Sequence, residues 1–261
     1  MKEWVVVTGA TSGIGRALVV HFADLNFNVL AIGRNEIELS RTKSLSSNAS
    51  NIISVVTDLS KKSASDDVAA KLNLATDKVK FLIHCAATPE PFSPLLDATE
   101  NQISVSMAVN VMAPLALTKK LMPFFSDVTR TLFFGSDYVG TMGKMRENVT
   151  GVYGIAKSAL DVAIAYLKRE NKNLLIGCVN PGSTNTRMFQ SVITAAGLFN
   201  SGIQSADPMV VARFVGAIFM KADNLSFISE KWDFRNRAHH DLLFSDVLRP
   251  ENADCKMRSK L

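Results

Sequence analysis

The first fifteen residues place a stiff stretch of backbone directly before a flexible one. The apolar run Trp-Val-Val-Val at residues 4–7 is followed by Thr-Gly-Ala-Thr-Ser-Gly-Ile-Gly at residues 8–15. β-branched residues favour an extended strand, whereas glycine permits a tight turn and a close approach of backbone to a ligand. A helical pattern begins at Ile14, and the amides at a helix N-terminus attract phosphate. The stretch therefore predicts a dinucleotide-binding turn; a plain glycine-rich turn is the alternative.

Short apolar runs and helical patterns alternate along the rest of the chain. The runs are continuously apolar, which is typical of parallel strands buried on both faces. Expected strands cover residues 4–7, 29–32, 52–56, 81–84, 131–134, 174–179 and, with a less regular pattern, 225–228. Expected helices cover residues 14–25, 37–45, 64–74, 99–121, 152–168 and 208–220. This alternation predicts an α/β fold, a Rossmann-type doubly wound parallel sheet of about seven strands with helices on both faces.

Composition limits the classes of protein that fit. No linker or repeat divides the 261 residues, so we expect one domain over residues 1–250 and a basic tail at 251–261. No apolar run reaches the ~18 residues of a membrane span, and the N-terminus lacks the pattern of a signal peptide. Three scattered cysteines indicate a reducing, cytoplasmic setting. The net charge of +5 is spread along the chain, which predicts neither nucleic-acid nor membrane binding, and no ligand spacing predicts a metal site.

The end of the second expected strand indicates which dinucleotide would bind. NAD is usually held there by an acidic residue that accepts from the ribose 2′-hydroxyl. This chain instead has Arg34 and Asn35 at that position. A guanidinium pairs well with a 2′-phosphate, so we expect NADP(H). The alternative is that Arg34 is an ordinary surface residue.

Asp58 and Leu59 follow the third expected strand. The carboxylate of Asp58 is placed to accept from the adenine amino group, with Leu59 beside the ring. Asp is also a common N-cap, so the second reading is that Asp58 only starts the next helix. The spacing alone leaves both readings open.

A phenol and an ammonium lie four residues apart in the expected helix 152–168. Tyr153 and Lys157 therefore share one helix face. Hydride reduction of a carbonyl leaves an alkoxide that needs a proton, and the pKa of a free tyrosine, ~10, is too high for efficient donation at neutral pH. An ammonium about 4 Å away favours the phenolate strongly enough to bring this pKa near neutrality.

Two further polar residues are candidates for the same chemistry. Ser136 follows the fifth expected strand, where doubly wound sheets build their sites. Its hydroxyl is suited to polarise a substrate carbonyl, although a simple turn serine would occupy the same place. Asn110 lies within the expected helix 99–121, where asparagine is a poor helix former. It either holds a water that relays protons through Lys157 or only faces solvent.

These features occur in one order along nearly the whole chain: the glycine-rich stretch, Asp58-Leu59, Asn110, Ser136, Tyr153 to Lys157, and Pro181-Gly182. Together they resemble the short-chain dehydrogenase/reductase family. The resemblance implies a catalytic triad of Ser136, Tyr153 and Lys157 with Asn110 as a fourth member, and Lys157 on the nicotinamide ribose. It also implies a homodimer or homotetramer, for which we expect an interface on helices 99–121 and 152–168. The expected NADP(H) contacts are Gly9, Thr11, Ser12, Gly13, Ile14, Gly15, Arg34, Asn35, Asp58, Leu59, Ala86, Ala87, Tyr153, Lys157, Pro181, Gly182, Thr184 and Thr186.

The chain departs from the family pattern at three places. His84-Cys85-Ala86-Ala87 replaces an Asn-Asn-Ala-Gly type of sequence, Ser136 and Tyr153 are separated by an enlarged loop, and the C-terminal part lacks a glycine-rich ending. The segment 227–234 is instead similar to the sepiapterin reductase and benzil reductase branch. That similarity adds Asp233 to Ser136, Tyr153 and Gly182 as expected substrate contacts, with a surface carboxylate as the alternative reading.

The segment 188–205 carries several large apolar residues around Gly197 and Gly202. We interpret it as a substrate lid, and an ordinary packed helix pair is the alternative.

The expected function is an NADPH-dependent reductase of ketones or aldehydes, with diketones or pteridine-like compounds as possible substrates. The other function in view is a non-catalytic, NADP(H)-sensing binding protein with the same fold.

Overall fold

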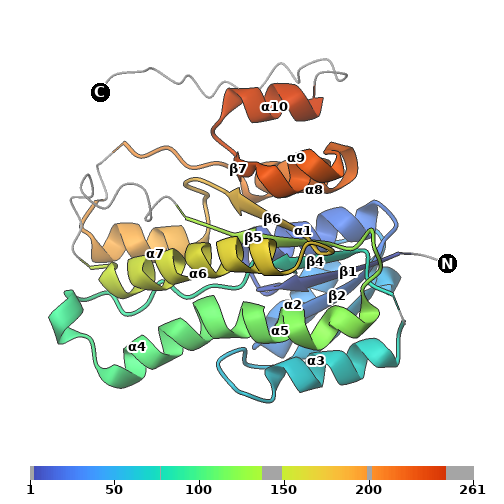
Figure 1. The fold of residues 1–261 in the computed structure, drawn as a ribbon. Helices are drawn as coiled ribbons and strands as arrows, with labels where there is room; N and C mark the ends of the chain where they lie inside the picture. Colours follow the sequence, from blue (N-terminus) through green and yellow to red (C-terminus); the bar gives the residue numbers. More distant parts are fainter. Residues whose placement is uncertain (1–2, 77, 137–148, 199–201, 245–261) are drawn as a thin grey trace.

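A computed structural model describes residues 3–76, 78–136, 149–198 and 202–244 (Figure 1). Within them, seven parallel strands form one sheet in the order β3-β2-β1-β4-β5-β6-β7. The strands are β1 (Trp4–Thr8), β2 (Asn28–Gly33), β3 (Ile52–Val56), β4 (Phe81–His84), β5 (Arg130–Phe134), β6 (Leu175–Asn180) and β7 (Lys231–Asp233). The predicted doubly wound sheet is confirmed. Strand order reverses between β1 and β4, which makes the crevice at their carboxyl ends the expected ligand site.

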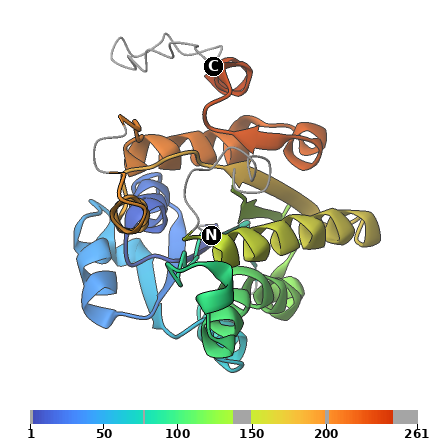
Figure 2. The same cartoon turned by 90° about the vertical axis from the view of Figure 1, so that its left-hand side faces the viewer.

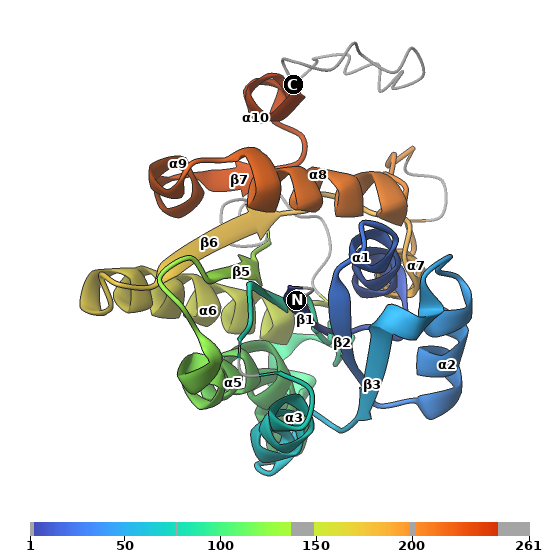
Figure 3. The ribbon, with the colours of Figure 1, turned by 90° about the vertical axis from the view of Figure 1, so that its right-hand side faces the viewer.

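Helices cover both faces of the sheet (Figure 3). One layer holds α1 (Gly13–Asp24), α2 (Glu36–Ser44) and α8 (Pro208–Lys221), and the other holds α3 (Ala64–Asn73), α5 (Ala113–Leu121) and α6 (Gly151–Glu170). The remaining helices are α4 (Glu100–Met107), α7 (Arg187–Ala195), α9 (Asn224–Ser229) and α10 (Arg237–Phe244). The strands point towards the side on which α7 and the first turns of α6 lie (Figures 1 and 2).

The continuous apolar runs provide buried side chains on both faces of the sheet, so that each strand packs against both helical layers. In β1, Val5 and Val7 are buried in the cluster that includes α1 and α8, whereas Trp4 and Val6 are buried in the cluster that includes α3 and α5. Successive side chains of a strand point to opposite faces, so a strand covered on both sides needs apolar residues at every position. Within the described ranges, no helix combines the length and the apolar character that crossing a membrane requires.

The expected strand at 225–228 is wrong: these residues belong to helix α9, and the seventh strand is β7. Asp223 caps α9, because its side chain accepts from the backbone N–H of Ser226. Phe227 is fully buried against Gly177 of β6. A short apolar run fits a strand and a helix equally well, and here the cap decides for the helix.

The expected helix at 99–121 is not continuous. A π-helical turn at Ala108–Met112 separates α4 from α5. Pro114, in the first turn of α5, has no N–H and cannot donate to the carbonyl of Asn110, the residue four positions earlier. Such turns inside α-helices are frequent at functional sites, and this one carries a predicted site residue.

Two helical glycines give opposite predictions for stability. A Cβ on Gly15 in α1 would lie 2.2 Å from the carbonyl oxygen of Gly9, whereas a Cβ on Gly154 in α6 would meet nothing within 4 Å. We expect Gly15→Ala to lower the free energy of unfolding by about 1–3 kcal/mol through this clash. Gly154→Ala should raise it by roughly 0.5–1 kcal/mol, because alanine favours the helix. Urea denaturation of both variants tests this, and equal effects would contradict the assigned packing.

Candidate active site

The turn between β1 and α1 needs glycine for conformation and for space. Gly9 and Gly13 have positive φ values of 75° and 53°, a region that favours glycine. A Cβ on Gly9 would lie 2.9 Å from the Cα of Ala86, and one on Gly13 would lie 2.8 Å from the Cγ2 of Thr186. The predicted cofactor residues after β1, β4 and β6 therefore meet at this turn. Ser12 is the N-cap of α1, and its side chain makes no capping hydrogen bond.

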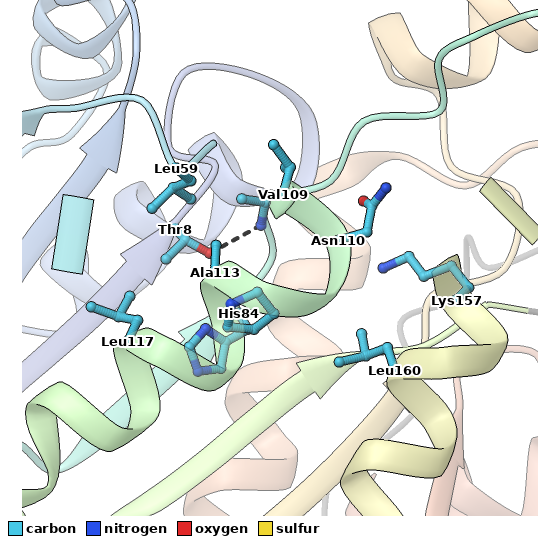
Figure 4. Close-up of a pocket in the computed structure, with 11 residues that line it drawn as sticks. Thr8, Leu59, His84, Val109, Asn110, Ala113, Leu117, Lys157 and Leu160 are labelled. Atoms are coloured by element: carbon cyan, nitrogen blue, oxygen red, sulfur yellow. Dashed lines mark hydrogen bonds between the residues drawn. The ribbon is translucent and has the colours of Figure 1, made fainter. Parts of the chain in front are cut away.

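Thr8 joins the loops after β1 and β4. Its Oγ1 accepts from the backbone N–H groups of Cys85 at 3.1 Å and of Ala86 at 3.0 Å. The dashed line in Figure 4 marks the second of these bonds. The side chain is 2% exposed. Sequence reasoning did not single out Thr8, although it begins the glycine-rich motif, because its partners lie more than 75 residues away.

Arg34 is exposed and directly follows β2. Asn35, also predicted to bind the cofactor, is the N-cap of α2, and its side chain accepts from the backbone N–H of Glu38 at 3.0 Å. The nearby carboxylate of Glu38 forms an ion pair with Arg16, whose guanidinium also donates to the carbonyl of Thr11. Arg16 thus ties the glycine-rich turn to α2, a role that the sequence did not reveal.

Asp58 does not cap the next helix, so this reading is wrong. Its Oδ1 accepts from the backbone N–H of Ser60 at 3.0 Å and from the Ser60 hydroxyl at 2.9 Å, whereas the N-cap of α3 is Ser63. The backbone hydrogen bond from Ser60 is the main cause that lowers the pKa of Asp58, and the charge of Arg34 acts in the same direction. Asp58 is therefore a charged group near Arg34.

Lys157 occupies the centre of the site. Its side chain is 2% exposed, and its Nζ donates to the carbonyl oxygen of Phe134 at the end of β5, 2.9 Å away. The Nζ also lies 5.7 Å from the ring centroid of Tyr153, one helical turn earlier. Burial lowers the pKa of Lys157 to about 8. The ammonium is therefore largely retained at neutral pH, beside the aromatic ring of Tyr153.

Asn110 does not face solvent, so that reading is wrong. It is 1% exposed and makes two hydrogen bonds with the backbone of Thr88. Its Oδ1 accepts from the N–H at 3.0 Å, and its Nδ2 donates to the carbonyl at 2.9 Å. Asn110 and Lys157 line the same cavity of about 10 Å³ (Figure 4), which has room for one water at most. The π-helical turn thus presents Asn110 to the loop after β4 on one side and to the lysine on the other.

His84 fills the space at the first departure from the family pattern. It is 5% exposed and stacks on Phe133, with ring centroids 4.7 Å apart. Its Nε2 lies 2.8 Å from Oγ1 of Thr118 on α5, and this hydroxyl donates to the carbonyl of Pro114. Burial lowers the pKa of His84 to about 3, so the imidazole is neutral. The replacement therefore links β4 to α5, the helix that directly follows the π-helical turn with Asn110.

Ser136 lies two residues beyond Phe134, whose carbonyl binds Lys157. The predicted serine is thereby placed at the carboxyl end of β5, one strand away from the turn after β4. The enlarged loop predicted at 137–150 lies outside the described residues, apart from its last two positions. The basic tail at 251–261 also lies outside them.

The predicted nicotinamide end is built around the turn after β6. Thr184 is buried and its hydroxyl lies 3.4 Å from the carbonyls of Pro181 and Gly182. Thr186 caps α7 by accepting from the backbone N–H of Phe189 at 3.1 Å. An open groove of about 560 Å³ runs between α1 and α7 and includes Ser12, Gly13 and Thr186 in its lining.

The predicted lid at 188–205 begins as helix α7, which contains no buried residue. Positions 199–201 lie outside the described residues. Among the described residues of the segment, α7 is the only helix, and residues 202–205 belong to no helix or strand. The reading as a packed helix pair is therefore wrong, and the role as a lid stays a prediction.

Asp233, a predicted substrate contact, pairs with Arg235. Its Oδ1 accepts from Nε of Arg235 at 3.0 Å, and its Oδ2 accepts from Nη2 at 2.6 Å. The arginine stem lies against the predicted substrate contact Gly182, where a Cβ would meet its Cδ at 2.9 Å. Asp233 is also the register partner of Asn180, at the carboxyl ends of β6 and β7. Arg235 thus lies on the turn where Asp233 was expected to act.

Comparisons with known proteins agree with this geometry. The family model described as short chain dehydrogenase matches residues 3–196. An L-xylulose reductase of Caenorhabditis elegans is 30% identical over 191 residues, which cover 70% of this chain and 72% of the relative. The oxidoreductase YciK of Escherichia coli is 28% identical over 193 residues, covering 70% and 74%.

Solved structures share the fold. The crystal structure of YciK from E. coli superposes with a TM-score of 0.76 at 23% identity, covering 90% of this chain and 95% of that one. A short chain dehydrogenase from Burkholderia cenocepacia in complex with NADP gives a TM-score of 0.77 at 20% identity, covering 88% and 95%. The family model thus matches most of the chain, including the glycine-rich turn and the buried lysine. The sheet order agrees with this match. This protein belongs to the short-chain dehydrogenase/reductase family of oxidoreductases.

Proposed function

We propose that this protein is an NADPH-dependent reductase of ketones or aldehydes. The observation that carries the proposal is the buried Lys157, one helical turn from Tyr153 and hydrogen-bonded to the strand that leads to Ser136. A non-catalytic protein that only senses NADP(H) has no need for a buried charge next to a phenol. The predicted sepiapterin reductase and benzil reductase branch stays a prediction, and with it the diketone and pteridine-like substrates.

The residues of the chain fit a dinucleotide. At Gly9 and Gly13 a Cβ would collide with neighbouring loops. Without side chains there, the backbone of the turn is left uncovered, directly before the N-terminus of α1, where phosphate groups bind. Arg34 offers a guanidinium beyond β2 for a 2′-phosphate. The carboxylate of Glu38 is engaged by Arg16. Bound NADPH would supply the hydride.

The side chains would then handle the proton. Tyr153 donates its phenolic proton to the oxygen of the reduced carbonyl, and Ser136 orients that oxygen by a hydrogen bond. Lys157 stabilises the resulting phenolate, because its ammonium lies beside the ring and is held there by the carbonyl of Phe134. Asn110 is fixed by Thr88 and lines the same small cavity as Lys157, where it would hold a water that relays protons through the lysine.

The preference for NADP(H) over NAD(H) has two lines of support. Arg34 follows β2 at the place where NAD-binding proteins usually have an acidic residue. Among solved structures with the same fold, an angucycline C-6 ketoreductase, LanV, contains bound NADP at a TM-score of 0.71 and 20% identity, covering 88% of this chain and 93% of that one.

Replacing Tyr153 by phenylalanine tests the catalytic assignment. We expect Tyr153→Phe to lower kcat by about 10²–10⁴-fold, because the proton donor is lost. The dissociation constant for NADPH, measured by nicotinamide fluorescence, should change by less than about twofold. Retention of more than a tenth of wild-type turnover against a panel of ketones, diketones and aldehydes would contradict the role of Tyr153. Tight NADPH binding by the wild-type protein without turnover on any panel member would favour the sensing function.

Replacing Arg34 by aspartate tests the cofactor. A charge-assisted hydrogen bond contributes about 1.5–3 kcal/mol, so Arg34→Asp should weaken NADPH binding by about 10–100-fold and improve the relative binding of NADH. The control is Arg41→Asp, which makes the same charge change at an exposed position of α2. Equal effects of the two variants on the ratio of NADPH to NADH affinity would overturn the assignment.

We also propose that the protein forms a homodimer or homotetramer through α4 and α6. Apolar side chains on these helices are exposed, with Val162 at 58% and Tyr166 at 57% on α6 and Val105 at 39% on α4. Grouped exposed apolar side chains often mark an interface. We expect light scattering to give at least a dimer mass, and Tyr166→Glu to lower that mass. The control Leu225→Glu, on the exposed side of α9, should not. A monomeric wild-type protein would contradict the proposal.

A further inference from the structure

Helix α6 carries an acidic residue on the same face as the tyrosine and the lysine. Asp161 follows Lys157 by four residues, as Lys157 follows Tyr153, so the three side chains lie one above another. The Oδ2 of Asp161 accepts from the Nζ of Lys231 on β7 at 2.5 Å. Its Oδ1 is buried, and in the described parts of the chain it has no hydrogen-bond partner. A buried carboxylate oxygen without a partner is costly and calls for a reason.

The space around this oxygen connects it to the site of the lysine. A Cβ on Gly135 would lie 3.5 Å from the Oδ1 of Asp161 and 3.1 Å from the Sγ of Cys178. Gly135 directly follows Phe134, whose carbonyl binds Lys157. The buried Oδ1 of Asp161 therefore lies beside the strand end that anchors the ammonium.

An ion pair with β7 does not account for the burial of Oδ1. The side chain of Lys231 is 53% exposed, and its Nζ pairs with the other oxygen, Oδ2. Exposed pairs of this kind contribute little to stability. Both oxygens of a carboxylate share its charge, so the ion pair with Lys231 leaves part of that charge on the buried Oδ1. Asp161 favours the charged form of Lys157 against the effect of burial.

Among the described residues, the side chains that favour the charged form of Lys157 are Cys85, Cys178 and Asp161, and the two thiols do so only as thiolates. Burial raises the pKa of the Cys85 thiol to about 12 and also raises the pKa of Cys178, so both are neutral. His84 is neutral as well. Lys168 donates to the carbonyl of Ile228 and its pKa is lowered by burial. Among the described residues, the titratable side chains next to Lys157, or next to a group that acts on it, are Tyr153, Asp161 and Lys168 on α6, His84 and Cys85 at the end of β4, Cys178 on β6 and Lys231 on β7.

We propose that Asp161 is a positioning residue of the active site, whose buried carboxylate keeps Lys157 in the ammonium form that binds the Phe134 carbonyl. This inference rests on the proposed function for its catalytic meaning. Its physical content concerns the charge of one lysine and is measurable without substrate. Lys231 opposes the effect, because its positive charge on Oδ2 offsets part of the field of the carboxylate.

Two variants move the titration of Lys157 in opposite directions. Asp161→Asn removes the anion, so the pKa of Lys157 should fall by about one pH unit. Lys231→Gln removes the offsetting cation, so the pKa of Lys157 should rise. General loosening of the helix would move both variants the same way. The measurement is a pH titration of ¹³C-labelled lysine side chains by NMR in the full chain, with the signal of Lys157 assigned by its loss in Lys157→Met.

The pH dependence of kcat/KM provides the second readout. Reduction requires a protonated tyrosine and a charged lysine, so activity is lost as the pH rises through their pKa values. The alkaline limb should move to lower pH in Asp161→Asn and to higher pH in Lys231→Gln. An unchanged NMR titration of Lys157 in both variants, or shifts of the same sign, overturns the role of Asp161. If the NMR titrations shift as expected but the limb of kcat/KM does not, the role of Asp161 stands and the proposed catalytic use of Lys157 fails.

Discussion

The site depends on a positive charge that the fold holds out of water. Removing an ammonium from water costs several kcal/mol even after the protein relaxes, which is why burial lowers the pKa of Lys157 to about 8. A hydrogen bond from the ammonium to a backbone carbonyl at the end of a strand offsets part of this cost. Phe134 ends β5, and its oxygen accepts from the Nζ at 2.9 Å. The same helix that supplies the lysine places Tyr153 one turn away, so the phenol and the charge that favours its ionisation are fixed by one rigid element.

The rest of the crevice is assembled by loops that approach one another where side chains are small. The turn after β1 touches the loop after β4 through Gly9 and the loop after β6 through Gly13. The hydroxyl of Thr8 satisfies two backbone N–H groups of the loop after β4. Buried backbone donors need partners, and a single threonine at the end of β1 supplies both. The reversal of strand order at β1 and β4 thus creates the crevice, and Thr8 joins the two loops that border it.

The sequence predicts the sheet well because strands covered on both faces must be apolar at every position, as β1 shows. It fails at 225–228, where the apolar run gives no preference between a strand and a short helix and the cap at Asp223 determines the outcome. The glycine-rich turn, Tyr153 and Lys157 are readable because their chemistry is local in sequence. Three other interactions cannot be predicted from the sequence: those of Asn110 with Thr88, of Asp161 with Lys231 and of Asp233 with Arg235. Each depends on how loops and strands meet, or on which of several polar neighbours a side chain selects.

The edge strand β7 is held in place mainly by its side chains. The family model ends at residue 196, and β7 lies beyond it. Three residues form few ladder hydrogen bonds, so the position of β7 depends on its side chains: Trp232 is fully buried, and the residues on either side of it form ion pairs. Lys231 pairs with Asp161 of the helix that carries the lysine, whereas Asp233 holds Arg235 against the turn at Gly182. A segment outside the matched part of the chain therefore contacts both the helix that carries Lys157 and the predicted substrate end.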